Sequence, residues 1–292
     1  MEFGVKLLKA ANHIFPKQRH PFNMQNDGTK TYAQWQYEKG KDTVAFFLNK
    51  YSLQDMFQNK TVLDLGCGAA GKSLYYASLG AEKVIGVDIV ASYQKSAEEL
   101  AEKLGLRDRF AFLAGDVTKL SLPEESVDTI IMNDFMEHAA QPEKVLQKAL
   151  KLIRKDGRIY INFPPYYHPF GAHLSDAIAI PWVHLFFSEQ TLIRSYKELT
   201  ARLPDGKERV AFRIAKDKDG KEYFSYINKM TIKRFERMLK ELNISPAYYH
   251  QAPLRGFLSP FAKGPCKEAF VKMVVCVIEK QPAVVPQKIS MV

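Results

Sequence analysis

Residues 61–73, T-V-L-D-L-G-C-G-A-A-G-K-S, carry the most informative pattern of this sequence. The segment starts with an apolar run, which predicts a buried strand over 61–65, and a helix is expected over about 70–79. Three glycines lie between the strand and the end of the segment: Gly66, Gly68 and Gly71. Glycine lets the backbone approach a ligand closely, and the N–H groups that open a helix favour a negatively charged group. The stretch therefore predicts a ligand-binding turn between a strand and a helix.

Two acids near strand ends narrow the choice of ligand. Asp64 lies near the end of the first predicted strand, and Asp88 follows a second one at 83–87. The glycine spacing together with Asp88 also fits a dinucleotide-binding turn, but Asp64 would repel an incoming pyrophosphate in a partly dry site. A zwitterionic ligand reverses the sign of that interaction. S-adenosylmethionine is such a ligand, because its ammonium group suits Asp64 and its ribose hydroxyls suit Asp88.

Three strand-end motifs follow one another along the chain: V-L-D-L-G-C-G from Val62, G-V-D-I from Gly86 and G-D-V from Gly115. In order and spacing they resemble the class I S-adenosylmethionine-dependent methyltransferases, over roughly residues 61–163. The resemblance implies an α/β fold with a Rossmann-like seven-stranded sheet, a methyltransferase activity, S-adenosylmethionine as cofactor and S-adenosylhomocysteine as product. Ala70 stands where the family usually carries its third glycine, and we expect a slightly different turn there.

The resemblance also implies which residues contact the cofactor. Asp116 would meet the adenine amino group, Val117 would pack on the adenine ring, and Asn133 would lie beside the methionine moiety. The expected cofactor-binding residues are Asp64, Gly66, Cys67, Gly68, Asp88, Ile89, Asp116, Val117 and Asn133.

Apolar runs and helical spacings alternate along the middle of the chain. Strands are predicted at 61–65, 83–87, 110–113, 127–132 and 158–163, with helices at 70–79, 91–104 and 141–154. This alternation predicts right-handed crossovers and a parallel sheet, which binds ligands at the carboxyl ends of its strands. The family's final helix and closing hairpin match a helix at 231–242 and strands at 243–250 and 268–279.

The N-terminal residues 1–60 are expected to form helices that cover the cofactor site. The predicted elements are a helix at 2–14, a loop at 16–28 and a helix at 30–50. On the second helix Tyr32 and Trp35 could cover the adenosine or the sulfonium, because an aromatic face attracts a cation. The alternative is that the two rings pack the helix onto the sheet.

A long connection of about 67 residues, 164–230, follows the fifth predicted strand. Connections of this length rarely occur in compact domains without a purpose, and we interpret this one as a substrate-binding lid inserted before the last core helix. It is expected to contain a helix at 188–203 and a hairpin around 216–220. The predicted organisation is N-terminal helices at 1–60, a cofactor-binding core at 61–163, the lid at 164–230, a completion of the sheet at 231–280 and a disordered tail at 281–292.

Methyl transfer from a sulfonium is an in-line displacement, so the protein mainly aligns the nucleophile and excludes water. A base is needed only when the nucleophile starts protonated. The run N-D-F-M-E-H at 133–138 resembles the E-H pair of small-molecule methyltransferases, including those of quinone biosynthesis. His138 is therefore a candidate base, or it anchors its loop.

A second candidate region is 164–187, an aromatic-rich segment that carries three of the seven histidines. Aromatic walls with a few polar groups are typical of a small-molecule pocket. The preferred catalytic residue is His173, which Gly171 makes accessible. The expected substrate-binding residues are Tyr166, Tyr167, His168, Trp182 and His184. The three histidines match no tight zinc spacing, so no metal site is expected, and the alternative is that they hydrogen-bond their own loops.

The net charge of +10 is concentrated in residues 1–60 and 201–280, whereas the predicted core is slightly acidic. Such flanks fit an anionic partner or an ordinary solvated surface, but without a separate nucleic-acid module we do not expect nucleic acid as a partner. Three cysteines without C-x-x-C spacing, and a start without a signal-peptide pattern, predict a cytoplasmic protein. No apolar run has the length of a membrane span. Residues 178–187 could contact a membrane surface, as an alternative to burial against the core. The oligomeric state is left open.

Taken with the resemblance, these patterns predict methylation of a small, largely aromatic or lipid-like metabolite on oxygen. One alternative is an RNA or protein methyltransferase that uses the basic flanks. Another is a non-catalytic regulator that binds S-adenosylmethionine, although intact acids at Asp64, Asp88 and Asp116 argue against it.

Overall fold

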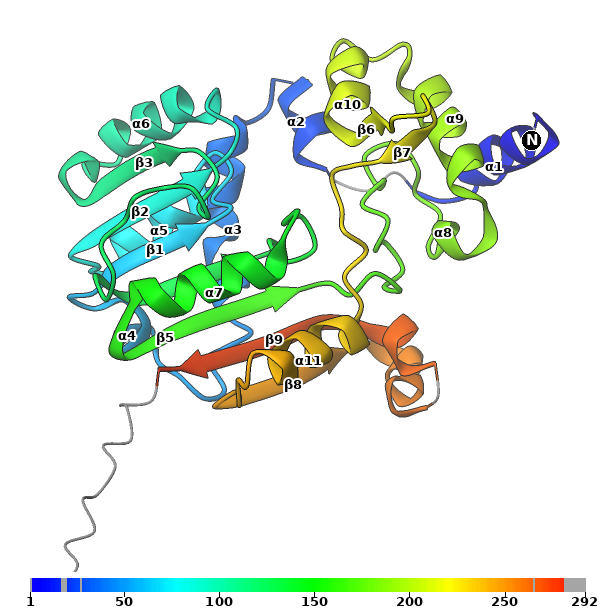
Figure 1. The fold of residues 1–292 in the computed structure, drawn as a ribbon. Helices are drawn as coiled ribbons and strands as arrows, with labels where there is room; N and C mark the ends of the chain where they lie inside the picture. Colours follow the sequence, from blue (N-terminus) through cyan, green and yellow to red (C-terminus); the bar gives the residue numbers. More distant parts are fainter. Residues whose placement is uncertain (1, 17–19, 27, 265, 281–292) are drawn as a thin grey trace, which may run out of the picture.

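The computed structural model describes residues 2–16, 20–26, 28–264 and 266–280. One sheet contains seven strands: β1 Thr61–Leu65, β2 Lys83–Asp88, β3 Phe110–Ala114, β4 Val127–Asn133, β5 Ile153–Phe163, β8 Tyr248–Pro253 and β9 Val271–Glu279. Their order across the sheet is β3-β2-β1-β4-β5-β9-β8 (Figure 1). The first five pair in parallel, and β9 is antiparallel to both of its neighbours. The expected Rossmann-like sheet is confirmed, and the predicted disordered tail lies outside the described residues.

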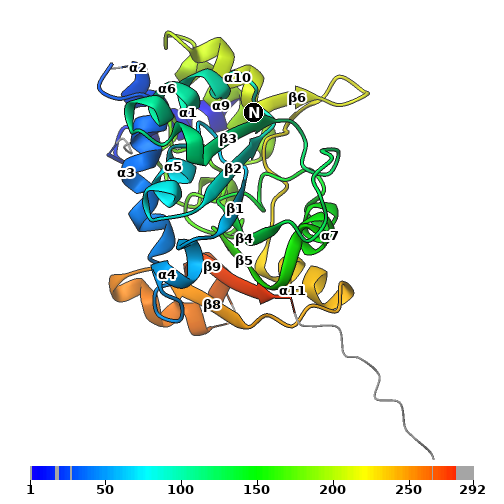
Figure 2. The same ribbon diagram turned by 90° about the vertical axis from the view of Figure 1, so that its left-hand side faces the viewer.

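Helices cover both faces of this sheet. One face carries α3 (Tyr32–Val44), α5 (Gly71–Ser78) and α6 (Tyr93–Lys103), and the other carries α7 (Pro142–Leu152) and α11 (Ile232–Glu241) (Figures 1 and 2). Buried apolar side chains fill both interfaces, among them Leu74 of α5 on the first face and Phe235 of α11 on the second. The near-continuous apolar runs of the central strands follow from this burial on both sides.

The fifth strand differs from its prediction. A strand was predicted at 158–163, but β5 begins at Ile153, so that Gly157 lies inside it. The pairing of β5 with β4 shifts register between Val127 and Thr129, as a bulge requires. A side chain at Gly157 would meet the Arg154 and Asp128 carbonyl oxygens at 3.0 Å, so only glycine fits the irregular stretch.

Several short helices escaped the sequence analysis. The predicted loop at 16–28 contains α2 (Pro21–Asn26), and α4 (Leu53–Phe57) precedes the first strand. A capping box between Ser52 and Asp55 opens α4, a local signal that the apolar periodicity does not reveal. The strand expected at 243–250 lies later, as β8, and the short 3-10 helices Gly256–Lys263 and Lys267–Phe270 connect it to β9.

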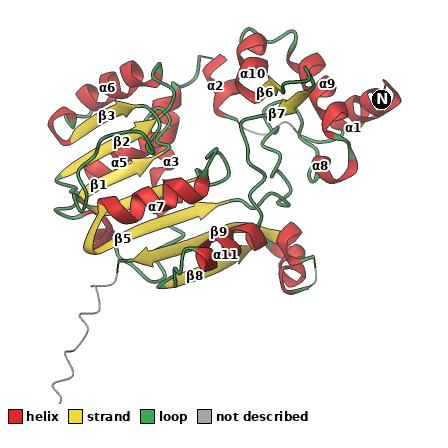
Figure 3. Cartoon of the chain, in the orientation of Figure 1, coloured by secondary structure: helices red, strands yellow, loops and turns green. Residues whose placement is uncertain are grey.

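Residues 164–230, here called the inserted lobe, lie beyond the carboxyl ends of the parallel strands (Figures 1 and 3). The lobe contains α8 (Val183–Phe186), α9 (Glu189–Thr200), α10 (Gly206–Arg213), β6 (Ile214–Lys216) and β7 (Glu222–Phe224). It has an apolar cluster of its own, and α1 (Glu2–Asn12) packs on α9 and adds Leu8 to that cluster. The hairpin expected around 216–220 is confirmed by the antiparallel pairing of β6 with β7.

A buried ionic network crosses the lobe. The Asp176 carboxylate accepts hydrogen bonds from Arg209 Nη1 at 3.2 Å, from Arg213 Nη2 at 2.9 Å and from the Tyr196 hydroxyl at 2.7 Å. All four residues are buried. Each buried charge here has a partner of opposite sign. Since Tyr196 lies in α9 and both arginines lie in α10, the network joins these helices to the loop before α8.

None of the described helices combines the length and the apolar character that crossing a membrane would need.

Candidate active site

The turn after β1 is shaped by left-handed backbone conformations. The backbone φ angle is 73° at Gly66, 57° at Gly68 and 58° at Ala70. Ala70 thus adopts the conformation that glycine usually provides, which accounts for the departure from the family pattern. The N–H groups of Gly66 and Cys67 both donate to the Val87 carbonyl, at 2.8 and 3.1 Å, so the turn is fastened to β2.

Asp64 points into the fold beside the first turn of α5. Its carboxylate accepts a hydrogen bond of 2.6 Å from the Ser73 hydroxyl, and the residue is 3% exposed. Burial raises its pKa to about 6 and the charge of Asp88 adds to this effect, whereas Ser73 and Lys72 oppose it. The carboxylate is thus held in place, and an ionised Asp64 would gain from a nearby cation.

Asp88 closes the turn from the end of β2. One carboxylate oxygen accepts from the Gly68 N–H at 2.8 Å and the other from the Val90 N–H at 2.9 Å. Burial raises the pKa of this carboxyl group, and the backbone hydrogen bonds oppose the shift. Each oxygen retains acceptor capacity for a further donor, such as a ribose hydroxyl. The neighbouring Ile89 leaves its side chain exposed.

The two residues predicted to contact adenine differ in their surroundings. Asp116 accepts hydrogen bonds from the Thr118 N–H and hydroxyl at 2.9 and 2.7 Å, and these hydrogen bonds lower its pKa. Val117 is buried in the core between the sheet and α7. Both roles stay predictions.

Asn133, at the end of β4, is fully engaged within the protein. Its carbonyl oxygen accepts from the Lys72 ammonium and, at 3.3 Å, from the Thr43 hydroxyl, while its amide donates to Asn162 at 2.9 Å. Lys72 also lies 3.3 Å from the Asp134 carboxylate. The sequence analysis missed Lys72, whose position one residue after the last glycine of the turn was its only signal.

Helix α3 covers the turn. A side chain at Gly68 would lie 2.7 Å from Gln36 Nε2 and 3.4 Å from the Tyr32 ring, so glycine is needed at that position. The Gly71 N–H donates to Gln36 at 3.3 Å, and Tyr32 stacks on Trp35 with ring centroids 6.2 Å apart. The close fit of α3 on the glycine turn places an aromatic ring beside the backbone that was predicted to hold the cofactor.

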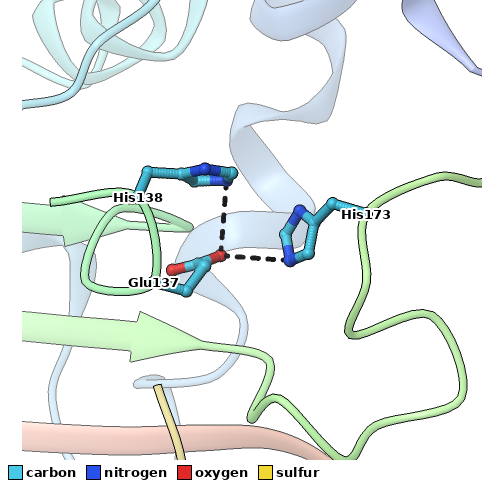
Figure 4. A group of neighbouring side chains, drawn as sticks. All are labelled: Glu137, His138 and His173. Atoms are coloured by element: carbon cyan, nitrogen blue, oxygen red, sulfur yellow. Dashed lines mark ion pairs between the residues drawn. The ribbon is translucent and has the colours of Figure 1, made fainter. Parts of the chain in front are cut away.

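The loop after β4 brings Glu137 and His138 together with His173, which is distant in sequence. His138 Nε2 and His173 Nε2 each lie 3.8 Å from Oε1 of Glu137, and the two imidazole rings are 4.8 Å apart (Figure 4). Glu137 is 3% exposed, and neither of its carboxylate oxygens has a hydrogen-bond partner among the described residues. The two candidate catalytic histidines are therefore neighbours, and Glu137 joins them.

Burial dominates the protonation of this group. It raises the pKa of Glu137 well above its usual value, to which Asp134 adds, while the residue's own N–H and Lys72 oppose the shift. Burial also lowers the pKa of His138, against the effect of its bond to Tyr226, and lowers that of His173 still further. The two imidazoles are therefore neutral at physiological pH.

Two lobe residues hold these three side chains in place. The Tyr226 carbonyl accepts from His138 Nδ1 at 2.7 Å. The Tyr226 hydroxyl donates to the Ala172 carbonyl, with the His173 carbonyl as a second acceptor at 2.7 Å. His173 has a left-handed φ of 52°, a strained conformation that this contact helps to maintain. Asn228 donates its N–H to the Glu137 carbonyl at 2.7 Å. Neither Tyr226 nor Asn228 carried a sequence signal.

The other lobe residues predicted to bind substrate have hydrogen bonds and ring contacts of their own, and, besides burial, the charge of His168 contributes to the lowered pKa of His173. Trp182 donates its indole N–H to the Ala269 carbonyl at 3.0 Å, and His168 accepts from the N–H of Phe170 at 3.1 Å. The rings of His184 and Tyr166 lie 4.8 Å apart, while Tyr167 is 40% exposed. Burial lowers the pKa of both His168 and His184 to about 4.

Comparison with known proteins decides the family. A family model described as a methyltransferase domain matches residues 57–226, more than half of the chain. The chain belongs to this family. It is an S-adenosylmethionine-dependent methyltransferase of class I, as the strand-end motifs predicted, and the glycine turn with Asp64 and Asp88 suits that cofactor's polar groups.

Curated relatives of this methyltransferase match over part of their length. Protein arginine N-methyltransferase 1 of Saccharomyces cerevisiae is 36% identical over 110 residues, which are 37% of this chain and 31% of that protein. Sterol 24-C-methyltransferase of Pneumocystis carinii is 28% identical over 106 residues, 36% of this chain and 28% of that protein. The matches thus span about a third of the relatives' length.

Solved structures match the methyltransferase over most of its length. A protein of Galdieria sulphuraria, provisionally assigned as a sarcosine dimethylglycine methyltransferase, has a TM-score of 0.53 at 14% identity and covers 89% of this chain and 97% of its own. A protein of Pyrococcus horikoshii has a TM-score of 0.50 at 18% identity, over 83% and 90% of the two chains. At these identities the likeness concerns the fold alone.

Proposed function

We propose that this methyltransferase transfers the methyl group to an oxygen atom of a small, largely aromatic or lipid-like metabolite. The carrying observation is the Glu137–His138–His173 group, in which two neutral imidazoles adjoin a buried carboxyl group. Phe135, two residues before Glu137, contacts the glycine turn: its ring occupies the space that a side chain at Gly66 would need. This contact indicates that the group lies near the turn. A hydroxyl nucleophile must lose a proton on methylation, and such a group can act on that proton.

The residues would divide the work as follows. When bound, S-adenosylmethionine supplies a methyl group on a sulfonium sulfur, which keeps the electron pair of the C–S bond as the C–O bond forms. Asp88 would hold the ribose hydroxyls, and Asp64 would stabilise the ammonium group. The acceptor's hydroxyl proton would pass to the Glu137–His138–His173 group, with His173 Nε2 as the first candidate.

The inserted lobe is proposed as the substrate-binding lid. It follows β5 at the carboxyl edge of the parallel strands, where ligands of such sheets bind. Its residues 166–187 bring several aromatic rings, which suits an apolar, ring-containing acceptor. A cytoplasmic location remains an expectation from the three unpaired cysteines.

A protein substrate is the second candidate, because curated relatives include protein arginine N-methyltransferases. Those matches cover 37% and 36% of this chain, so they leave most of it without a counterpart. One assay can separate the two candidates, with a methyl-labelled donor and three acceptor classes: hydroxylated aromatic and lipid-like metabolites, an arginine-rich peptide, and RNA.

We expect label on a metabolite hydroxyl and none on peptide or RNA. His173→Ala should lower turnover about 10²–10⁴-fold if the imidazole takes the proton, while affinity for S-adenosylhomocysteine stays intact. His138→Ala is the matched variant, because it removes the other imidazole of the same group. Label on the peptide alone, or full activity in both variants, would overturn the proposed acceptor chemistry.

A further inference from the structure

The Glu137–His138–His173 group has a geometry that hydrogen bonds do not explain. The two Nε2 atoms lie 3.8 Å from Glu137 Oε1, which is too long for a hydrogen bond of either protonation state. One ligand atom from each of the three residues can be chosen so that all lie within 4.8 Å of one another. Three polar atoms thus converge on the buried Glu137 carboxyl group without bonding to each other, while the His138 and His173 side chains are 34% and 21% exposed.

The tautomer of His138 determines which of its ring nitrogens faces Glu137. A carbonyl oxygen can only accept, so we assign the proton of the ring to Nδ1, which donates to Tyr226 at 2.7 Å. The Nε2 atom of the neutral ring then presents a lone pair toward the oxygens of Glu137. Buried polar atoms without hydrogen-bond partners are unfavourable, so the oxygens of Glu137 and this lone pair favour a cation between them.

The described part of the chain supplies no such charge. The ion-pair contacts of Glu137 there are those with the two histidines, and both of its carboxylate oxygens lack hydrogen-bond partners. Lys72 is occupied by Asn133 and Asp134, and Arg213 by Asp176. A cation at this point would therefore not be one of the described side chains.

The donor set indicates which cation fits. Two imidazole nitrogens and one carboxylate are ligands that first-row transition metals accept, whereas Mg²⁺ and Ca²⁺ prefer oxygen ligands. Ligand atoms about 2.1 Å from an ion lie about 3.4 Å apart at tetrahedral angles. The two separations of 3.8 Å from Glu137 need a small closure, and the whole set, within 4.8 Å, needs the two histidines to approach each other as well. Three protein ligands leave a coordination position open, as in catalytic metal sites.

We propose that Glu137, His138 and His173 bind a divalent first-row transition-metal ion such as Mn²⁺ or Zn²⁺. The Tyr226 carbonyl and hydroxyl orient the two histidines, and Asn228 fixes the backbone of Glu137, as the outer partners of metal ligands do. The expectation of no metal considered the lobe histidines alone, and it missed this site because Glu137 and His138 come from another loop.

The role of the ion rests on the proposed function. When bound, the ion would act as a Lewis acid that lowers the pKa of an acceptor hydroxyl. His173 Nε2 would then be a ligand of the ion, and the released proton would pass to solvent water in place of the direct transfer to His173 described above. Binding of the ion itself depends only on the three side chains. It can therefore be tested without knowledge of the substrate.

The test is calorimetric titration of chelator-treated full-length protein with Mn²⁺ and with Zn²⁺. Wild type should bind one ion per chain, and its melting temperature should rise with the ion. Glu137→Gln keeps the shape of the side chain but should weaken ion affinity at least about 100-fold. His184→Ala is the matched control, because it removes a half-buried lobe histidine outside the group and should leave ion affinity unchanged.

S-adenosylhomocysteine binding serves as the second readout, and it should be the same in wild type and Glu137→Gln. No stoichiometric ion in wild type, or equal ion affinity in Glu137→Gln, would overturn the metal site. If Glu137→Gln does not fold, His173→Ala carries the same test and the same expectation. Stoichiometric ion binding without methylation of any hydroxyl would instead overturn the proposed function and leave the metal site standing.

Discussion

Asp88 shows how a single residue can serve both the fold and a ligand. Its two oxygens accept from Gly68 and Val90, and the same oxygens are proposed to hold the ribose hydroxyls. Charge-assisted hydrogen bonds contribute about 1.5–3 kcal/mol each. Asp88→Ala should therefore weaken S-adenosylhomocysteine binding at least about tenfold in calorimetry.

The same substitution should also lower the melting temperature, because it leaves two N–H groups of the turn without their partner. Asp88→Asn is the matched variant, since it keeps an oxygen acceptor but removes the charge. We expect it to lie between wild type and Asp88→Ala in stability. Unchanged affinity in the alanine variant would show that the ribose is held elsewhere.

Asp64 predicts a pH dependence of cofactor binding. Its pKa of about 6 in the free protein means that the carboxyl group is largely neutral at pH 5 and ionised at pH 7.5. Only the ionised form attracts an ammonium group, so S-adenosylhomocysteine should bind about tenfold more weakly at pH 5 than at pH 7.5. Calorimetry across this range would measure the effect, and Asp64→Asn should flatten the part due to this residue.

The same shift has the opposite sign for stability. A carboxyl group whose pKa is higher in the folded than in the unfolded state stabilises the fold at pH values below the unfolded pKa. That contribution is lost as the pH rises through about 6.

Affinity for S-adenosylhomocysteine that is flat with pH in wild type would mean that Asp64 does not face the ammonium.

Residues at strand ends were predictable for a physical reason, and the lobe contacts were not. Asp64 and Asp88 follow apolar runs, and parallel strands place such positions at one edge of the sheet. His173 comes to Glu137 from the lobe, where it has a left-handed backbone conformation and its carbonyl contacts the Tyr226 hydroxyl. Long-range contacts of this kind leave no periodic pattern in one sequence.

At the scale of elements, the buried network of Asp176 determines the integrity of the inserted lobe. Asp176→Ala would leave Arg213 without its carboxylate partner and would leave Arg209 with Asp205 in place of two carboxylates. Removing one partner of a buried ion pair costs about 3–5 kcal/mol, so we expect a destabilisation of that order in urea unfolding. At urea concentrations below the unfolding transition, the variant should still bind the cofactor at the sheet.

Glu198→Ala is the control for this experiment. It removes an exposed ion pair between α1 and α9, Lys9 with Glu198, which water screens. Little change is expected there. A similarly small effect of Asp176→Ala would mean that the lobe stays folded without its ionic network.

Elements with strong periodicity were predicted well, and those fixed by local capping or bulges were not. The helix of α7 follows from its apolar face and the proline in its first turn. The early start of β5 depends on a register shift against β4, which only the paired strand reveals. The short helix α10 begins at a glycine and lacks a side-chain cap, so its sequence gave no start signal.

At the scale of the whole molecule, the excess of 42 basic over 32 acidic residues raises the question of nucleic-acid binding. We predict no RNA affinity tighter than about micromolar at physiological salt, which is the non-specific range. Fluorescence anisotropy with single-stranded and stem-loop RNA would measure it, and weak binding should vanish steeply as salt rises. A nanomolar complex that survives physiological salt would favour an RNA substrate.

The double use of Tyr226 has a consequence for protein engineering. Exchanging substrate specificity between relatives by transplanting a lobe assumes that the graft carries recognition while the host keeps its chemistry. Here His138 and Glu137 belong to the host loop after β4. The donor lobe would have to supply the Tyr226 carbonyl that orients His138 and the Asn228 N–H that contacts the Glu137 carbonyl. A chimera cut before Tyr226 keeps the host's own supports for these side chains, whereas a cut after Asn228 replaces them with those of the donor.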